Sequence, residues 1–331
     1  MKRHKNFNLL LMLVLLVAVG QMAQTIYIPA IADMAVALNV REGAVQSVMA
    51  AYLLTYGISQ LFNGPLSDRV GRRPVILVGM SIFMLATLVA ITTHSLPVLI
   101  AASAMQGMGT GVTFSMAKWM PETRPEGAPR TKLLASYKTL FGTGAFNCYL
   151  LMLIGGLAGI AVFEACSGVL MGAVLGLSSM AVSILFILPI PAAFFGAWFA
   201  GRPNKRFPTL MWQSVICCLL AGLMMWIPGL LGIMTVWTLL VPAALFFFGA
   251  GMLFPLATSG AMEPFPFLAG TAGALVGGLQ NIGSGVLAWL SAMMPQTGQG
   301  SLGLLMMLMG LLILLCWLPL ASRFTHHQQP V

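Results

Sequence analysis

Polar side chains that could bind a small molecule recur at helical spacing inside otherwise apolar stretches of this chain. They are Gln21, Gln24 and Tyr27 in the first such stretch, Tyr52, Tyr56 and Gln60 in the second, and Gln280, Asn281 and Ser284 in a later one. Residues three or four positions apart lie on one face of a helix, so each group predicts a polar stripe. Among Phe, Met and Trp side chains, such stripes suit a lipophilic or amphipathic ligand better than a sugar, which needs many more polar partners. We therefore predict a binding cavity formed by Gln21, Gln24, Tyr27, Tyr52, Tyr56, Gln60 and Gln280. The alternative is that each residue only hydrogen-bonds across a helix interface.

Two carboxyl groups are placed to exchange protons at the edges of apolar stretches. Asp33 follows the first stretch, and Glu164 lies near the end of the stretch at 144–165. Burial disfavours the charged form of a carboxylate and can bring its pKa toward neutrality, as proton transport requires. We predict both residues as proton-coupling candidates, although each could instead be a solvated charge at a helix end.

The histidines and cysteines indicate neither a metal centre nor an enzyme. All 4 histidines lie at chain ends or in loops, and the 5 cysteines lie in apolar stretches without metal-ligand spacing. A membrane-embedded enzyme would need nucleophiles, acid–base pairs or metal ligands within those stretches. We therefore expect no catalytic residue, no metal and no cofactor.

The most specific motif joins two apolar stretches and reads Gly64-Pro65-Leu66-Ser67-Asp68-Arg69-Val70-Gly71-Arg72-Arg73-Pro74. The Asp68 carboxylate can accept charge-assisted hydrogen bonds from Arg72 or from a neighbouring helix end. The glycines allow a tight turn. We predict a gating loop that latches helices together, formed by Gly64, Asp68, Arg69, Gly71, Arg72 and Arg73. A basic turn with no latching role is the simpler alternative.

Apolar stretches long enough to cross a bilayer must position these residues. They run at about 9–32, 44–62, 75–93, 98–117, 144–165, 177–200, 208–228, 236–258, 268–293 and 301–320, by the criterion of roughly twenty apolar residues per span. Hydrophobic residues make up 59% of the chain and charged residues only 7%. This composition predicts an all-α membrane protein.

The basic residues orient the predicted spans. With a cytoplasmic N-terminus, all 16 lysines and arginines except Arg41 fall on the cytoplasmic side, which is the positive-inside pattern. Basic loops beside anionic lipid account for the net charge of +9, so no nucleic-acid partner is expected. We predict a multi-pass protein of the bacterial inner membrane with both termini in the cytoplasm. A basic N-terminus before an apolar run also fits a cleaved signal peptide, but the polar stripe that continues to Tyr27 favours a retained first helix.

The Gly64–Pro74 motif resembles the loop signature G-x-L-x-D-R-x-G-R-R of the major facilitator superfamily, and in particular of its drug/proton antiporters. Other segments strengthen the resemblance: Tyr27–Ala30, Gln106–Gly109, Pro121–Thr123 and Gly270–Leu275. The resemblance implies a monomeric exporter of hydrophobic or amphipathic compounds, driven by the proton gradient through alternating access. It also implies that the Gly64–Pro74 loop stabilises the outward-facing state.

The chain departs from this family in length. Members usually have twelve helices, whereas we predict about ten spans here. Residues 98–111 resemble the start of the family's fourth helix and Thr113–Thr123 the end of its sixth, so the stretch at 98–117 is interpreted as a fusion without the fifth helix. Ser103 stands where many relatives have an arginine.

The shortened chain is expected to have four parts. They are an N-terminal transmembrane bundle at 1–117, a cytoplasmic linker at 118–143, a C-terminal bundle of six helices at 144–322 and a cytoplasmic tail at 323–331. Because the missing helix would line the family's central cavity, two alternatives remain beside efflux: an internally deleted member that inserts but does not transport, and a membrane-embedded enzyme.

Overall fold

The computed structural model describes residues 31–70, 72–113, 133–202, 206–265 and 268–326, and these ranges are helical and joined by short turns. The helices are α2 (Ile31–Ala37), α3 (Glu42–Val70), α4 (Arg72–Thr92), α5 (Leu96–Thr113), α6 (Leu133–Phe141), α7 (Gly144–Val169) with the π-helical turn η3 (Leu170–Val174), α8 (Ser179–Ile187), α9 (Ile190–Ala200), α10 (Phe207–Leu230), α11 (Val236–Met262), α12 (Ala269–Met293) and α13 (Gly300–His326). The all-α prediction is confirmed.

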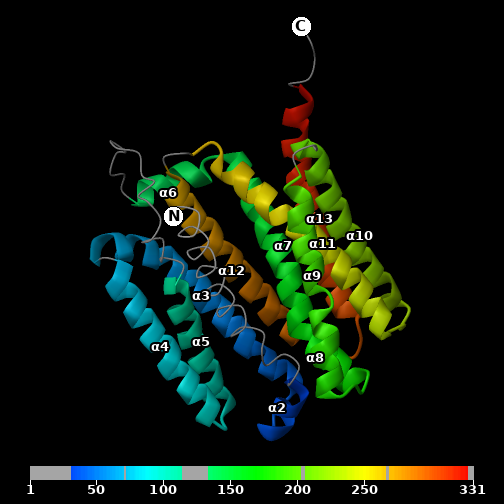
Figure 1. Ribbon diagram of the computed structural model, residues 1–331. Coiled ribbons are helices and arrows are strands. Elements are labelled where there is room, and N and C mark those ends of the chain that lie inside the picture. The colour runs from blue at the N-terminus through cyan, green and yellow to red at the C-terminus, as the bar shows by residue number, and fades with distance from the viewer. Residues whose placement is uncertain (1–30, 71, 114–132, 203–205, 266–267, 327–331) are drawn as a thin grey trace, which may run out of the picture.

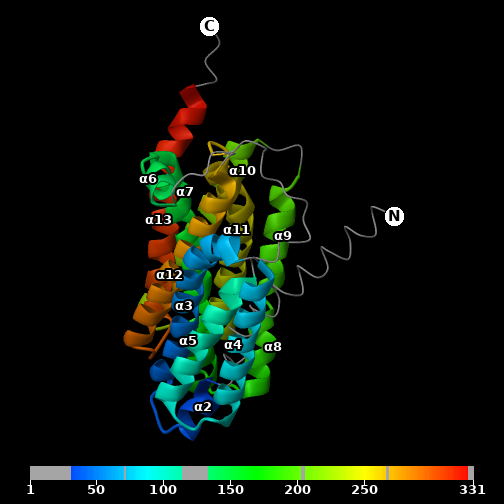
Figure 2. The same cartoon turned by 90° about the vertical axis from the view of Figure 1, so that its left-hand side faces the viewer.

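The long helices run side by side between two opposite ends of the molecule (Figures 1 and 2). One end carries α2, the turn between α4 and α5, and the start of α8; we call it the α2 end. The other carries α6 and the last turns of α13, and we call it the α6 end. Within the described residues, each of the predicted spans from 44–62 onward coincides with a helix or a consecutive pair of helices. Nearly all of the stretch at 9–32 and the last residues of the stretch at 98–117 lie outside them.

Several of these helices are long and apolar enough to cross a bilayer. Within the described residues they are Gly144–Val174, Ser179–Ala200, Phe207–Leu230, Val236–Met262 and Gly300–Phe324, with shorter apolar helices at Leu77–Thr92 and Leu96–Thr110. Large apolar side chains are exposed on the outer faces of these helices, including Met84 and Ile91 on α4 and Phe194 and Trp198 on α9. Such a surface suits hydrocarbon as its solvent, and the protein is a multi-pass membrane protein.

Some predicted boundaries are wrong, because an apolar run does not mark where a helix ends. The predicted span 144–165 continues through η3 to Val174, and the chain turns only at Gly176, whose φ is +68°. The predicted gating loop is also mostly helical in its backbone: α3 continues through Gly64 to Val70, and α4 begins at Arg72. Between Gly64 and Pro74, only Gly71 falls outside a described helix.

The predicted linker at 118–143 contains a helix, α6, whose Leu140 is fully buried. This helix packs against α7 and α12. The predicted fusion point, between Gly111 and Thr113, lies in the last turn of α5, and residues 114–132 after it lie outside the described residues.

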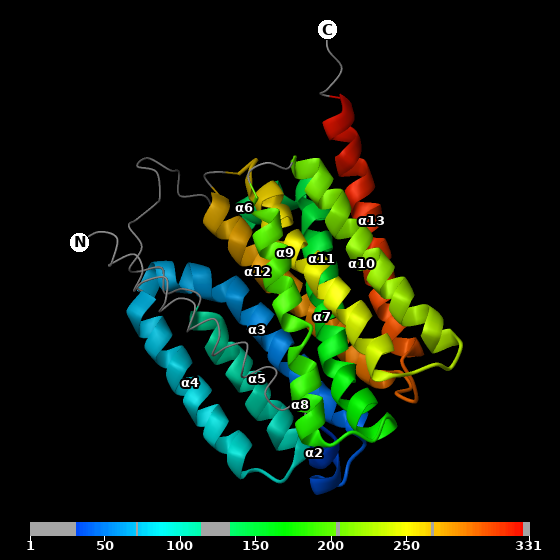
Figure 3. The same cartoon turned by 45° about the vertical axis from the view of Figure 1, so that its right-hand side comes forward.

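The predicted span 177–200 is divided into two helices at a proline. The helix α8 ends at Ile187 and α9 begins at Ile190, with Pro189 as its N-cap (Figure 3). Proline cannot donate the hydrogen bond that would continue the helix, so a break here is expected. By contrast, Pro242 and Pro255 lie inside the continuous α11.

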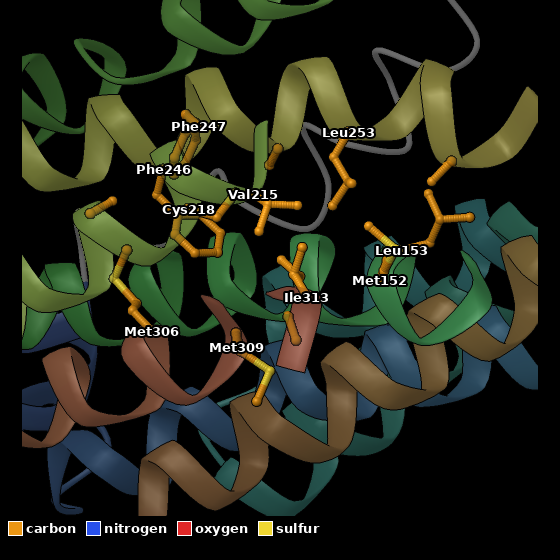
Figure 4. Packing of buried hydrophobic residues seen from close by; sticks show 14 of the residues in the cluster. Met152, Leu153, Val215, Cys218, Phe246, Phe247, Leu253, Met306, Met309 and Ile313 are labelled. Carbon is orange, nitrogen blue, oxygen red and sulfur yellow. The ribbon is translucent and has the colours of Figure 1, made fainter. Parts of the chain in front are cut away.

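The main apolar core lies among α7, α10, α11 and α13. Figure 4 shows side chains such as Leu153, Val215, Phe246 and Ile313 meeting between these helices. Glycines allow the close approach that this core needs, since a methyl group at Gly159 would collide with the ring of Phe246. In a bilayer, close packing of small residues is a principal source of helix association.

Candidate functional site

The helices α3 and α12, far apart in sequence, pack along each other in antiparallel fashion; we call this contact the α3–α12 seam. A methyl group at Gly43 would lie 2.8 Å from the carbonyl oxygen of Ala292, and one at Gly285 would lie 3.0 Å from Cβ of Leu53. The seam joins the helices before the predicted linker to those after it. It is therefore a contact that any relative movement of the two groups must change.

Gly57 is the tightest point of the seam that the described residues show. A methyl group there would collide with the carbonyl oxygen of Gly278 and would lie 2.7 Å from the backbone nitrogen of Ile282. Both neighbours are backbone atoms, which cannot rotate away. The seam thus depends on a residue without a side chain at this position.

The predicted binding residues Tyr52 and Tyr56 lie on α3 away from the seam and toward α5. The Tyr52 hydroxyl donates a hydrogen bond of 3.0 Å to Oγ1 of Thr110 on α5, and the two tyrosine rings are 5.9 Å apart. Gly107 of α5 lets the helices approach there, because a methyl group would collide with the carbonyl oxygen of Tyr52. Both tyrosines are buried.

The predicted binding residue Gln60 lies at the seam itself. Its Oε1 accepts a hydrogen bond of 3.3 Å from Nδ2 of Asn281 on α12, and the same Asn281 amide donates to the carbonyl oxygen of Gly277 at 2.8 Å. Gln280, one residue earlier on α12, is half-buried. The structure therefore brings Gln60 next to the α12 stripe but separates both from the Tyr52–Thr110 pair.

An apolar cluster closes the α2 end of the molecule across both groups of helices; we call it the α2-end cluster. Its buried members are Ile31, Ala35, Val45, Met49, Leu53, Ala161, Ala165, Val169, Phe186 and Ala288. They come from α2 and α3 on one side of the linker and from α7, α8 and α12 on the other. A cavity between the two groups would thus be sealed at this end.

One polar contact spans the same end. The Ser179 hydroxyl, in the first turn of α8, donates a hydrogen bond of 2.5 Å to Oδ2 of Asp33 on α2. Asp33 is exposed, and it lies at a helix N-terminus that Ser178 caps through its side chain. A carboxylate is favoured there by the helix dipole. The contact adds a polar tie to the α2-end cluster.

Glu164, the other proton-coupling candidate, is buried on α7 with 8% of its surface exposed. It lies between Ala161 and Ala165, both of which belong to the α2-end cluster. Its carboxyl group is therefore largely shielded from solvent, and the proton-coupling role of Glu164 stays a prediction.

Sequence reasoning missed Gln46, a fully buried glutamine on α3. Neither its Nε2 nor its Oε1 has a hydrogen-bond partner. Gln46 and Gln60 are about four helical turns apart on α3. Extending the predicted polar stripe of Tyr52, Tyr56 and Gln60 toward the start of the helix would have included Gln46.

Several predicted site residues lie outside the described part of the chain. They are Gln21, Gln24, Tyr27 and Gly71, and for Asp68, Arg69, Arg72 and Arg73 the same holds of the side chains; Gly64 is described only as part of the α3 backbone. In the part of the chain that the structure describes, no group of three His, Cys, Asp or Glu residues could hold a metal ion.

Comparison with known proteins identifies the family. A sequence model of the Major Facilitator Superfamily matches residues 13–122. The chain is 74% identical to "Multidrug resistance protein D" of Escherichia coli (strain K12) over 394 aligned positions that cover 100% of both proteins. It is 25% identical to "Chloramphenicol resistance protein" of Pseudomonas aeruginosa over 76% of each protein.

A solved structure is also similar in sequence. "Structure of the Multidrug Transporter EmrD from Escherichia coli" shares 75% identity and covers 94% of this chain and 100% of its own, with a TM-score of 0.40. The near-complete match at 74% identity, together with the all-helical membrane fold, settles the family. The chain belongs to the major facilitator superfamily.

Proposed function

We propose that this chain is a multidrug efflux transporter that exports hydrophobic or amphipathic compounds across the bacterial inner membrane by proton antiport. The observation that carries the proposal is the 74% identity, over its full length, to a relative named for multidrug resistance. Membership of a transporter family also favours transport over a membrane-embedded enzyme. Small molecules and protons are the proposed partners, and a monomer is the proposed unit.

The geometry supports alternating access. In the orientation proposed from the basic residues, both termini and the α6 end face the cytoplasm and the α2 end faces the periplasm. The α2-end cluster and the Asp33–Ser179 contact join the helices before and after the linker at that end. Export then requires these contacts to part, which rocking of one bundle against the other would achieve. We propose bundles at 1–117 and 144–322 as the moving bodies.

The binding residues are proposed in two groups. Gln60 and Gln280 offer amide groups near the seam, and Tyr52 and Tyr56 offer aromatic surface between α3 and α5. With Gln21, Gln24 and Tyr27 they supply a few hydrogen-bonding points among many apolar side chains, which suits lipophilic compounds. Glu164 and Asp33 are the proposed proton-coupling residues, and Gly64–Arg73 the proposed gate.

A second candidate is an internally deleted member that inserts into the membrane but does not transport. The alignment with the Escherichia coli relative has 394 positions, whereas the chain has 331 residues, a difference of 63. Because both proteins are covered completely, the missing positions lie within the alignment. Lost helices would remove packing partners from the bundle.

Proteoliposomes separate these two functions. The purified chain is reconstituted, a pH gradient is imposed, and movement of a fluorescent amphipathic cation is followed, with equilibrium binding measured on the same preparation. The proposal predicts gradient-driven accumulation that collapses with a protonophore. Protein that inserts into the liposomes but gives no accumulation would support the deleted-member candidate. In cells, the chain should lower the sensitivity of an efflux-deficient host to amphipathic drugs.

A further inference from the structure

Gln46 is a fully buried polar side chain on α3 whose amide is left without hydrogen-bond partners. Its exposed fraction is 0%, and both amide atoms lack a partner. In Gln213 and Trp317 one buried side-chain atom lacks a partner, Oε1 and Nε1 respectively, whereas in Gln46 both amide atoms do. The Gln299 amide, by contrast, accepts from Thr238 at 2.8 Å and donates to the carbonyl oxygen of Met225 at 2.9 Å. An unpaired amide in an apolar interior is unfavourable, and the unpaired group requires an explanation.

The position of Gln46 supplies that explanation. It lies on the face of α3 that forms the seam, between Gly43, which approaches Ala292, and Leu53, which approaches Gly285. Its neighbours Val45 and Met49 belong to the α2-end cluster. The orphaned amide is therefore enclosed where the two groups of helices meet, at the end that must open for export.

Closing the α2 end buries the Gln46 amide without partners, whereas opening it admits water to the same amide. The free-energy cost is thus present in the closed state and absent in the open one. Because the cost falls on the closed state alone, the Gln46 amide shifts the equilibrium between closed and open α2 ends toward the open state. The apolar cluster and the Asp33–Ser179 hydrogen bond act in the opposite direction.

We propose that Gln46 is a positioning residue for transport: its orphaned amide destabilises the closed α2 end, so that this end opens often enough for export. The inference rests on the proposed function only in requiring that the α2 end opens. It assigns no contact with the transported compound to Gln46.

The test measures opening directly. Ala288→Cys places a reporter thiol at a position that is 0% exposed in the α2-end cluster. A membrane-impermeant maleimide is added to spheroplasts, and mass spectrometry identifies the labelled peptide, so the native cysteines remain. Labelling of the reporter then requires the cluster to part.

Gln46→Met keeps the length of the side chain and removes both polar atoms. We expect it to slow labelling of the reporter by about tenfold, because the buried orphan no longer opposes closure. Gln46→Leu should act in the same direction, and Gln46→Asn, which keeps an amide, should label nearly as fast as the parent.

The matched control is Gln213→Met. Gln213 also has a buried amide oxygen without a partner, but it lies on α10, which packs against α11 and α13 of its own half. We expect its labelling rate to equal that of the parent.

Unchanged or faster labelling in both Gln46→Met and Gln46→Leu would overturn the inference, as would a reporter that is never labelled in the parent. Slower labelling in a chain that fails to accumulate drug in proteoliposomes would support the inference while contradicting the proposed function. Labelling tests the inference and drug accumulation tests the proposed function, so failure of one is distinguishable from failure of the other.

Discussion

Replacing Gly57 by alanine should weaken the α3–α12 seam. The added methyl group would collide with the carbonyl oxygen of Gly278 and lie 2.7 Å from both the backbone nitrogen and Cγ1 of Ile282. Because two of these three contacts are backbone atoms, the side chains around them cannot relieve the overlap by changing rotamer. The helices themselves must move apart.

The magnitude follows from two opposing effects. Overpacking of a well-packed interior costs about 1–3 kcal/mol, and backbone contacts on one side place Gly57→Ala in the upper part of that range. Alanine in a helix interior regains up to about 1 kcal/mol over glycine. The net loss of stability should be about 1–2 kcal/mol, which lowers the apparent Tm by a few degrees.

The assay is thermal unfolding in detergent, followed by tryptophan fluorescence, with Gly144→Ala as the control. Gly144 begins α7, and a methyl group there would meet no atom within 4 Å. The Gly144→Ala protein should unfold at the same temperature as the parent protein. Equal melting of the Gly57→Ala and Gly144→Ala proteins would refute the reasoning, since both gain the same methyl group and only Gly57 lacks room for it.

Three further changes probe separate contacts. A double-mutant cycle with Gln60→Leu and Asn281→Leu should give a coupling energy of about 0.6 kcal/mol in thermal unfolding; zero coupling would mean that their 3.3 Å hydrogen bond does not contribute to the seam. Ser179→Ala removes the donor to Asp33, and labelling of a thiol in the α2-end cluster should become faster by roughly twofold to tenfold, whereas no change would exclude this contact as a tie. Glu164→Gln should abolish drug movement driven by a pH gradient and leave equilibrium drug binding intact; unaltered coupling would remove Glu164 from the candidates.

The helices were predictable from sequence because a bilayer imposes both their length and their composition. The stretches at 208–228 and 301–320, for example, each coincide with one long helix, α10 and α13. Helix ends were less predictable, because turns of α3 beyond residue 62 carry polar and charged residues and leave no apolar signal. The divided helix at Pro189 was indicated by the proline itself.

The candidate site was only partly predictable. Periodicity identified Tyr52, Tyr56 and Gln60 as one stripe, and the structure shows that their side chains spread over a face wide enough to reach two different helices. Which helix each one meets depends on long-range packing, which spacing along the chain does not encode. Gln46 escaped notice because its significance is its lack of partners, and that is a property of the folded chain.

The α2 end illustrates why a transporter can retain an unfavourable buried group. Apolar burial from five helices and the Asp33–Ser179 hydrogen bond all stabilise the closed end. Without an opposing contribution, a closed state favoured by several kcal/mol would leave the open state too rare to support turnover. By the inference above, the orphaned amide of Gln46 contributes in the opposite direction at the same location. On this proposal, the amide brings the two end states closer in free energy, which alternating access requires.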